Sequence, residues 1–177
     1  MHRALGSLLF LALAVPAIGA SPANTDSHLE ADGAKGLYAA SAFAHGLRHG
    51  YEEGFHDADR ALQLSAFSIE EIPFKKPAKI IGYQSAFGSK ESFRKGYEAG
   101  YRLGYSDSLK GIAFRMNAPA VEVAAGPDKD FDHGVQYGYA APGTACSGAP
   151  AFCAGVKAGR ALAAESQNDT QVASAAR

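Results

Sequence analysis

Glycine recurs every fourth residue in the segment 93–107, FRKGYEAGYRLGYSD, at Gly96, Gly100 and Gly104. This spacing places the glycines along one stripe of an α-helix. A strand is disfavoured because the segment lacks β-branched residues and because interior glycine weakens strands. Each glycine inside a helix costs about 1 kcal/mol relative to alanine, so three of them cost roughly 3 kcal/mol. We expect close approach of a neighbouring helix along the bare stripe to offset this cost.

The same frame occurs in four copies along the chain. Phe43 and Asp57 match Phe93 and Asp107, with three glycines between them in each copy, and two shorter copies begin at Phe131 and Phe152. Short units that cannot bury a face alone normally stack on one another. We therefore expect a mostly α fold: four short glycine-striped helices in a small helical repeat or bundle, joined by long irregular connections. The glycines expected to pack the helices are Gly46, Gly50, Gly54, Gly96, Gly100, Gly104, Gly134, Gly138, Gly155 and Gly159.

Residues 1–20 have the features of a secretory signal peptide. His2 and Arg3 form a basic start, residues 8–15 are apolar, and small residues precede Ser21. A buried first helix or a membrane anchor is the alternative, but the apolar run is shorter than the ~20 residues that span a bilayer. We expect no transmembrane span after signal removal and a secreted or periplasmic location.

The mature chain divides into three parts by composition. We expect a flexible N-terminus over 21–35, a helical domain over 36–165 and a disordered tail over 166–177. Within the domain the pattern predicts a helix over 37–67, a second beginning at an N-cap Ser89, a third capped by Asp128 or Asp130, and a fourth from Pro150 to about residue 165.

The two cysteines, Cys146 and Cys153, lie between the third and fourth predicted helices. An even cysteine count in an exported chain predicts one disulfide, here closing the turn of a helical hairpin. A redox pair is the alternative, but the spacing is not C-x-x-C and no basic residue lies nearby to lower a thiol pKa.

Three potential metal ligands share one stripe of the first helix: His45, His49 and Glu52. Histidines at i and i+4 can chelate a metal ion. The stripe lies opposite an apolar side that contains Leu47 and Tyr51, so we expect it to be solvated. An exposed polar face is the simpler interpretation.

Other candidate chemistry is sparse. Asp57 recurs as Asp107, and we expect each carboxylate to bond a neighbouring helix end or a tyrosine hydroxyl rather than to act in acid–base catalysis. The tyrosines that follow the glycines could stack on a ligand, but at helical spacing they are more typical of a core. The charge is nearly balanced, with 17 Lys and Arg against 18 Asp and Glu, which gives no support for nucleic-acid binding.

The run F-x-x-G-Y-x-x-G-Y-x-x-G-Y-x-D over 93–107 resembles a motif of small exported bacterial proteins to which no activity is assigned. The resemblance covers about fifteen residues clearly and 43–57 more loosely. It implies an exported, helical protein and carries over no functional residue. Gly96-Tyr97, Gly100, Gly104 and Asp107 also echo a helix of Tai-type periplasmic immunity proteins, whose cysteines fall at other places.

These observations favour an exported, non-enzymatic structural or interaction protein. It would pack its helices through the F-x-x-G-x-x-x-G repeats and bind itself, an envelope component or another protein, without a cofactor. The alternative is a metal- or small-ligand-binding module that uses His45, His49 and Glu52.

Overall fold

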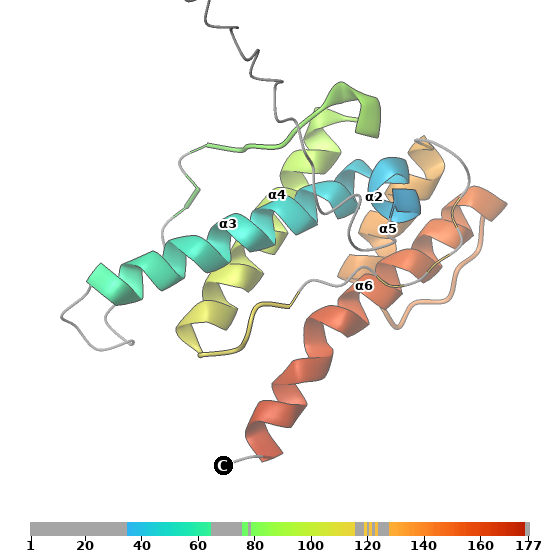
Figure 1. The fold of residues 1–177 in the computed structure, drawn as a ribbon. Helices are drawn as coiled ribbons and strands as arrows, with labels where there is room; N and C mark the ends of the chain where they lie inside the picture. The colour runs from blue at the N-terminus through green and yellow to red at the C-terminus, as the bar shows by residue number, and fades with distance from the viewer. Residues whose placement is uncertain are drawn as a thin grey trace, which may run out of the picture.

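The computed structural model describes residues 35–64, 76–77, 79–115, 119, 121, 123 and 128–175, with side chains described as far as residue 166. The predicted signal peptide and nearly all of the segment 21–35 lie outside these residues. The described helices are α2 (Lys35–Ala40), α3 (Ala42–Leu64), α4 (Lys90–Leu109), α5 (Lys129–Ala140) and α6 (Pro150–Ala175), with a short 3-10 turn, η2, at Ser85–Phe87. Strands are absent from the described residues, so the mostly α fold is confirmed (Figure 1).

The predicted helix starts agree with local hydrogen bonds. The Ser89 side chain accepts a hydrogen bond from the backbone N–H of Ser92 at 3.1 Å and caps α4. Asp128, rather than Asp130, caps α5 by accepting from the backbone N–H of Phe131 at 2.8 Å. Pro150 is the first residue of α6, where its missing N–H costs nothing.

Two helix boundaries differ from the prediction. The helix expected over 37–67 is divided at Ser41; α3 is described as far as Leu64, and residues 65–67 lie outside the described residues. The Ser41 hydroxyl accepts from the backbone N–H of Ala44 at 3.1 Å, as an N-cap does, and this starts α3 as a separate helix. Helix α6 continues to Ala175, through the tail that we expected to be disordered, because no glycine or proline lies between residues 160 and 175 to end it.

Helices α3 and α4 form the first pair and contact each other through their glycines. A β-carbon placed at any of the six glycines would lie 2.0–2.1 Å from a backbone oxygen of the partner helix. The partners are Phe93, Tyr97 and Tyr101 for Gly46, Gly50 and Gly54, and Phe43, Leu47 and Tyr51 for Gly96, Gly100 and Gly104. Because both series ascend together, the two helices run parallel, and the contact is symmetric between the two copies of the repeat.

Helices α5 and α6 form the second pair, which repeats this arrangement. Gly134 and Gly138 lie against Phe152 and Val156, so these helices are also parallel. Cys146 and Cys153 form the expected disulfide, with Cα atoms 5.6 Å apart. The hairpin turn that we expected there is wrong, since the connection 141–149 must return along α5 before α6 begins. The disulfide ties the end of this return to the first turn of α6.

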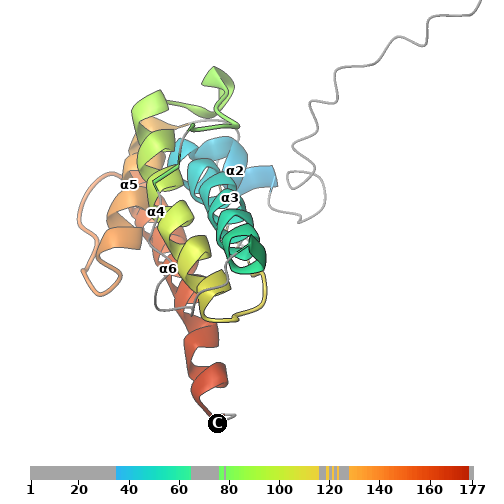
Figure 2. The same ribbon diagram turned by 90° about the vertical axis from the view of Figure 1, so that its left-hand side faces the viewer.

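The two pairs pack on each other across a core that α2 joins (Figure 2). Phe43 and Leu47 of α3 meet Phe131 and Val135 of α5 in this core. A second cluster holds the tyrosines that follow the glycines of α4. Tyr97, Tyr101 and Tyr105 are each at most 2 % exposed, so they are core residues and not a ligand-facing ladder.

None of the helices in the described residues is both long and apolar enough to cross a membrane.

Candidate functional site

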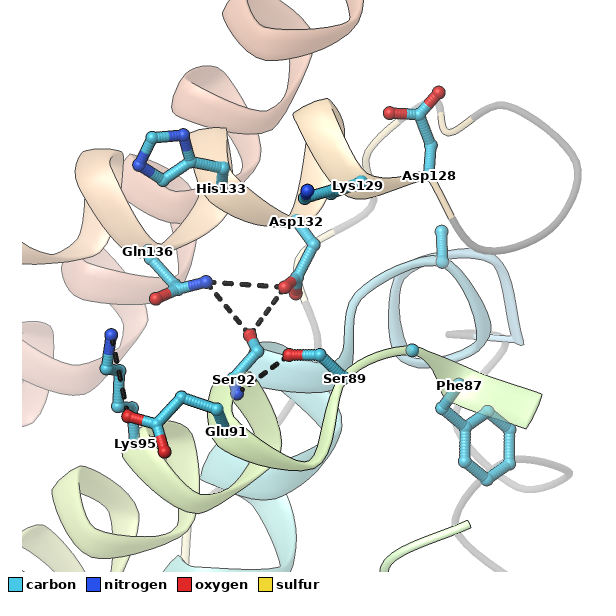
Figure 3. A pocket seen from close by; sticks show the side chains of 12 residues that line it. Phe87, Ser89, Glu91, Ser92, Lys95, Asp128, Lys129, Asp132, His133 and Gln136 are labelled. Atoms are coloured by element: carbon cyan, nitrogen blue, oxygen red, sulfur yellow. Dashed lines mark hydrogen bonds and ion pairs between the residues drawn. The ribbon is translucent and has the colours of Figure 1, made fainter. Parts of the chain in front are cut away.

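A pocket of about 540 Å³ opens where the second pair meets the start of α4 (Figure 3). We call it the interpair pocket. It takes residues from the end of α2, from η2 and the start of α4, and from the first three turns of α5. Its lining is Ala40, Phe87, Gly88, Ser89, Glu91, Ser92, Lys95, Asp128, Lys129, Asp132, His133 and Gln136.

Asp132 is the polar centre of this pocket. Its carboxylate accepts hydrogen bonds from the Ser41 hydroxyl at 2.6 Å and from the backbone N–H of Phe43 at 2.9 Å, so it caps the start of α3 from outside. The Ser92 hydroxyl of α4 also donates to it, and so does the Gln136 amide at 3.3 Å. Figure 3 shows Asp132, Ser92 and Gln136 joined in one triangle. With four donors, the carboxylate is a structural acceptor that fastens the second pair to both helices of the first.

The rim of the pocket carries charged side chains, of which some form ion pairs and others do not. A hydrogen bond from the Arg94 guanidinium lowers the pKa of Glu91, and the Lys95 ammonium lies 3.8 Å from the same carboxylate. Lys129 and His133 are exposed, and neither forms an ion pair within the described part of the chain. The pocket therefore offers hydroxyl, amide, ammonium and carboxylate groups, which suits binding through hydrogen bonds.

The recurring aspartates bond tyrosine hydroxyls, as we expected. Tyr51 donates to Asp107 at 3.0 Å, and Tyr101 donates to Asp57 at 2.8 Å. Tyr51 and Tyr101 occupy the same position of the repeat, as do the two aspartates, so each copy supplies a donor to the other's carboxylate. These carboxylates hold the first pair together.

Asp107 has a second partner in Arg115, which follows α4. The guanidinium Nε lies 2.9 Å from one carboxylate oxygen and Nη2 lies 3.2 Å from the other. Asp107 is only 2 % exposed, so the charge is buried and paired. Although burial alone would lower it, the pKa of Arg115 is raised by its hydrogen bond to Asp107. Burial raises the pKa of Tyr51 to about 12.

The histidines are placed differently from our expectation. His45 is fully buried, and its Nε2 lies 3.0 Å from the Nε2 of His49. The expectation that this stripe is solvated is wrong at the two histidines, because the segment 79–88 covers them: the Phe87 ring lies 4.1 Å from the His45 ring, and Gly82 lies against the His49 ring. His45 and His49 supply two potential ligands, but the described residues contain no group of three or more His, Cys, Asp or Glu arranged to hold a metal ion. Glu52 does not complete such a group.

Sequence reasoning missed the interpair pocket and its central carboxylate. One weak signal existed. Asp132 follows the first residue of its repeat copy, where the other copies have Ala44, Arg94 and Cys153. A lone carboxylate at that position marks a local departure from the repeat, but its partners at the start of α3 and on α4 come from distant parts of the chain. Comparisons with family models, curated proteins and solved structures found no match to this chain.

Proposed function

We propose that this chain is an exported, non-enzymatic protein that binds another protein, with the interpair pocket as part of its binding surface. The observation that carries the proposal is the pocket itself. Both helix pairs contribute to its walls, and Asp132 of the second pair is joined to the first pair through three hydrogen bonds, from Ser41, Phe43 and Ser92. An opening with such a fixed frame, and with both lysines and carboxylates on its rim, suits the capture of a polar group.

The hydrogen bonds that the carboxylates accept within the fold support a non-enzymatic role. General acid–base catalysis needs a carboxyl group that can reach a substrate proton. Asp57, Asp107 and Asp132 instead accept hydrogen bonds from side chains or backbone of neighbouring helices. Their chemistry is used to hold the fold together.

The glycines already pack helices within the chain, which limits the surfaces where a partner can bind. All ten glycines that we expected to pack helices lie against a backbone atom within the same chain. Their stripes are filled, so neither self-association nor partner binding can use them without separating a pair. A binding surface must lie elsewhere, and the interpair pocket is a described opening of suitable size.

Site-specific photo-crosslinking in the cells that produce the protein tests this proposal. A photoreactive residue replaces Lys95 at the pocket or, as a matched control, Lys110 at the other end of α4; both lysines are exposed. We expect a defined protein adduct from position 95 and none from position 110. Identical adducts from both positions, or none from position 95, would contradict the proposal.

A further inference from the structure

His45 and His49 share one proton across a short contact between their rings. The two Nε2 atoms lie 3.0 Å apart, and the rings are nearly parallel, with an angle of 7° between their planes. A hydrogen bond of this kind needs one nitrogen that carries a proton and one that does not, whatever bonds the other ring nitrogens make. A second proton would place two N–H groups and two positive charges face to face. The contact therefore exists only while one of the two facing nitrogens is unprotonated.

A backbone segment lies against both rings of the pair. We call this segment, residues 79–88, the cover. The Phe87 ring lies 4.1 Å from the ring of His45, which is fully buried. At Gly82 a β-carbon would lie 2.6 Å from the His49 ring, and φ is +83°, so the cover meets this ring at a position that requires glycine. Because apolar surroundings disfavour an added charge and the cover confines both rings, the pair can take up a second proton only if the cover moves.

The cover also forms part of the interpair pocket. Phe87 and Gly88 line this pocket beside Ser89, the N-cap of α4. Figure 3 shows Phe87 and Ser89 on one side of the pocket and Lys129 of α5 on the other. A movement of Phe87 away from His45 therefore changes the shape of the pocket.

Imidazoles are the side chains that change charge in mildly acidic solution. An imidazole in water takes up its proton near about pH 6.5, whereas carboxylates ordinarily titrate near about pH 4 and tyrosine, lysine and arginine at about pH 10 or above. Other titratable groups lie on the elements packed around the pair: Tyr38 of α2, Arg48, Glu52 and Glu53 of α3, Lys79 and Tyr83 of the cover, and Lys90 and Tyr97 of α4. Between about pH 7.5 and 5.5 we therefore expect a change of charge at the histidines rather than at these neighbours.

We propose that the contact between His45 and His49 is an acid-sensitive latch that keeps the cover, and with it one wall of the interpair pocket, closed. As the pH falls, the second imidazole takes up a proton, the rings separate and the cover lifts. The open form binds one proton more than the closed form, so the closed form is favoured above the ordinary range of histidine and is lost as the pH falls through it. One extra proton raises the ratio of open to closed molecules by about tenfold between pH 7.5 and 5.5. This inference rests on the proposed function, because it gives the pocket a regulation by pH.

Fluorine NMR on the full chain tests the inference. A 4-fluorophenylalanine replaces Phe87, and a dissolved paramagnetic reagent broadens its signal in proportion to its exposure to solvent. We expect this broadening to rise severalfold between about pH 7.5 and 5.5, as the share of the open form increases about tenfold. The matched control is the same label at Phe43, whose ring lies 5.4 Å from Tyr139 in the core between the pairs. Its broadening should stay constant.

Substitutions in the labelled protein assign the response to the latch. His49→Gln removes one proton-binding group but keeps a hydrogen-bonding side chain beside His45, so it should abolish most of the change at Phe87. His45→Gln removes the other half of the latch and should give the same loss, which makes the test independent of how either variant folds. His133→Gln is the matched control, because it removes an exposed imidazole from the same pocket and should leave the response unaltered.

Several results would overturn the inference. One is equal broadening at Phe87 at the two pH values, and another is a response that survives both latch variants or that His133→Gln abolishes. An equal rise at Phe43 would also overturn it, since the whole protein would then be loosening. If these tests fail while the crosslink from position 95 forms, the proposed function stands and only the latch is wrong. The opposite pattern would support the latch and contradict the proposed function.

Discussion

Gly100→Ala adds one methyl group at one of the closest backbone contacts of the first pair. The new Cβ would lie 2.0 Å from the carbonyl oxygen of Leu47 and 2.8 Å from the backbone nitrogen of Tyr51. An ordinary carbon–oxygen contact is about 3.3 Å, so the helices must separate by roughly 1.3 Å at this point. Both of these atoms belong to backbone inside a helix, so neither can rotate away.

The change in the free energy of unfolding follows from two opposing contributions, helix propensity and overpacking. Alanine gains about 1 kcal/mol over glycine in a helix interior. Overpacking costs about 1 to 3 kcal/mol or more, and a gap of this size forfeits a large part of the dispersion energy along the seam. We therefore expect Gly100→Ala to lower the free energy of unfolding by about 2 kcal/mol, opposite in sign to the helix propensity.

Urea unfolding followed by circular dichroism measures this change. Gly143→Ala is the matched control, because a β-carbon at Gly143 has nothing within 4 Å and the same methyl group is added. We expect the control to alter stability by less than about 1 kcal/mol. By the symmetry of the repeat, Gly50→Ala should cost as much as Gly100→Ala. An unfolding midpoint for Gly100→Ala at or above that of the unaltered protein would refute the close-contact argument.

Three further predictions concern bonds between elements. Tyr51→Phe should lower the free energy of unfolding by about 1 to 2 kcal/mol, and Tyr101→Phe should lower it by less. The reason is that Asp107, which accepts from Tyr51, is more buried than Asp57, which accepts from Tyr101. Equal costs for the two substitutions in urea unfolding would contradict this. Burial raises the pKa of Tyr51 and Tyr97 to about 12, whereas unfolded tyrosine titrates near 10, so the unfolded chain loses protons first as pH rises. Stability should be complete below about pH 10 and fall toward pH 12, which parallel urea and tyrosinate-absorbance titrations would show; constant stability across that range would be inconsistent with the burial. Reducing the Cys146–Cys153 disulfide should cost about 2 to 3 kcal/mol, measured by unfolding with and without reductant, and an unchanged midpoint would count against a structural role.

Local signals in the sequence predicted much of the fold. The four glycine-striped helices, the caps at Ser89 and Asp128 and the disulfide all depend on residues close together in the chain. The parallel direction of each pair could not be predicted, because a bare stripe admits a neighbour running either way. The glycine spacing indicates that the backbones of two helices approach each other closely. The relative direction of the two helices is set by the long connections that return along each helix.

The candidate site was much less accessible to sequence reasoning. The apolar side of α3 was identified correctly, but nothing local shows that residues 79–88 fold back over His45 and bury a polar stripe. Likewise, Ser92 and Asp132 carry no sequence signal that they meet, since they lie in different pairs. Both features depend on how distant segments are placed in space, which residue patterns constrain only weakly.

The order of contacts across the first pair is the most direct test of the account, because every later argument depends on parallel pairs joined through glycine. Nuclear Overhauser effects from glycine Hα protons to the partner helix measure it. We predict that Gly46 contacts Tyr97 and that Gly104 contacts Phe55, so that both helices ascend together. Contacts in the opposite order, from Gly46 to the end of α4, or no contact from these glycines to another helix, would contradict the account.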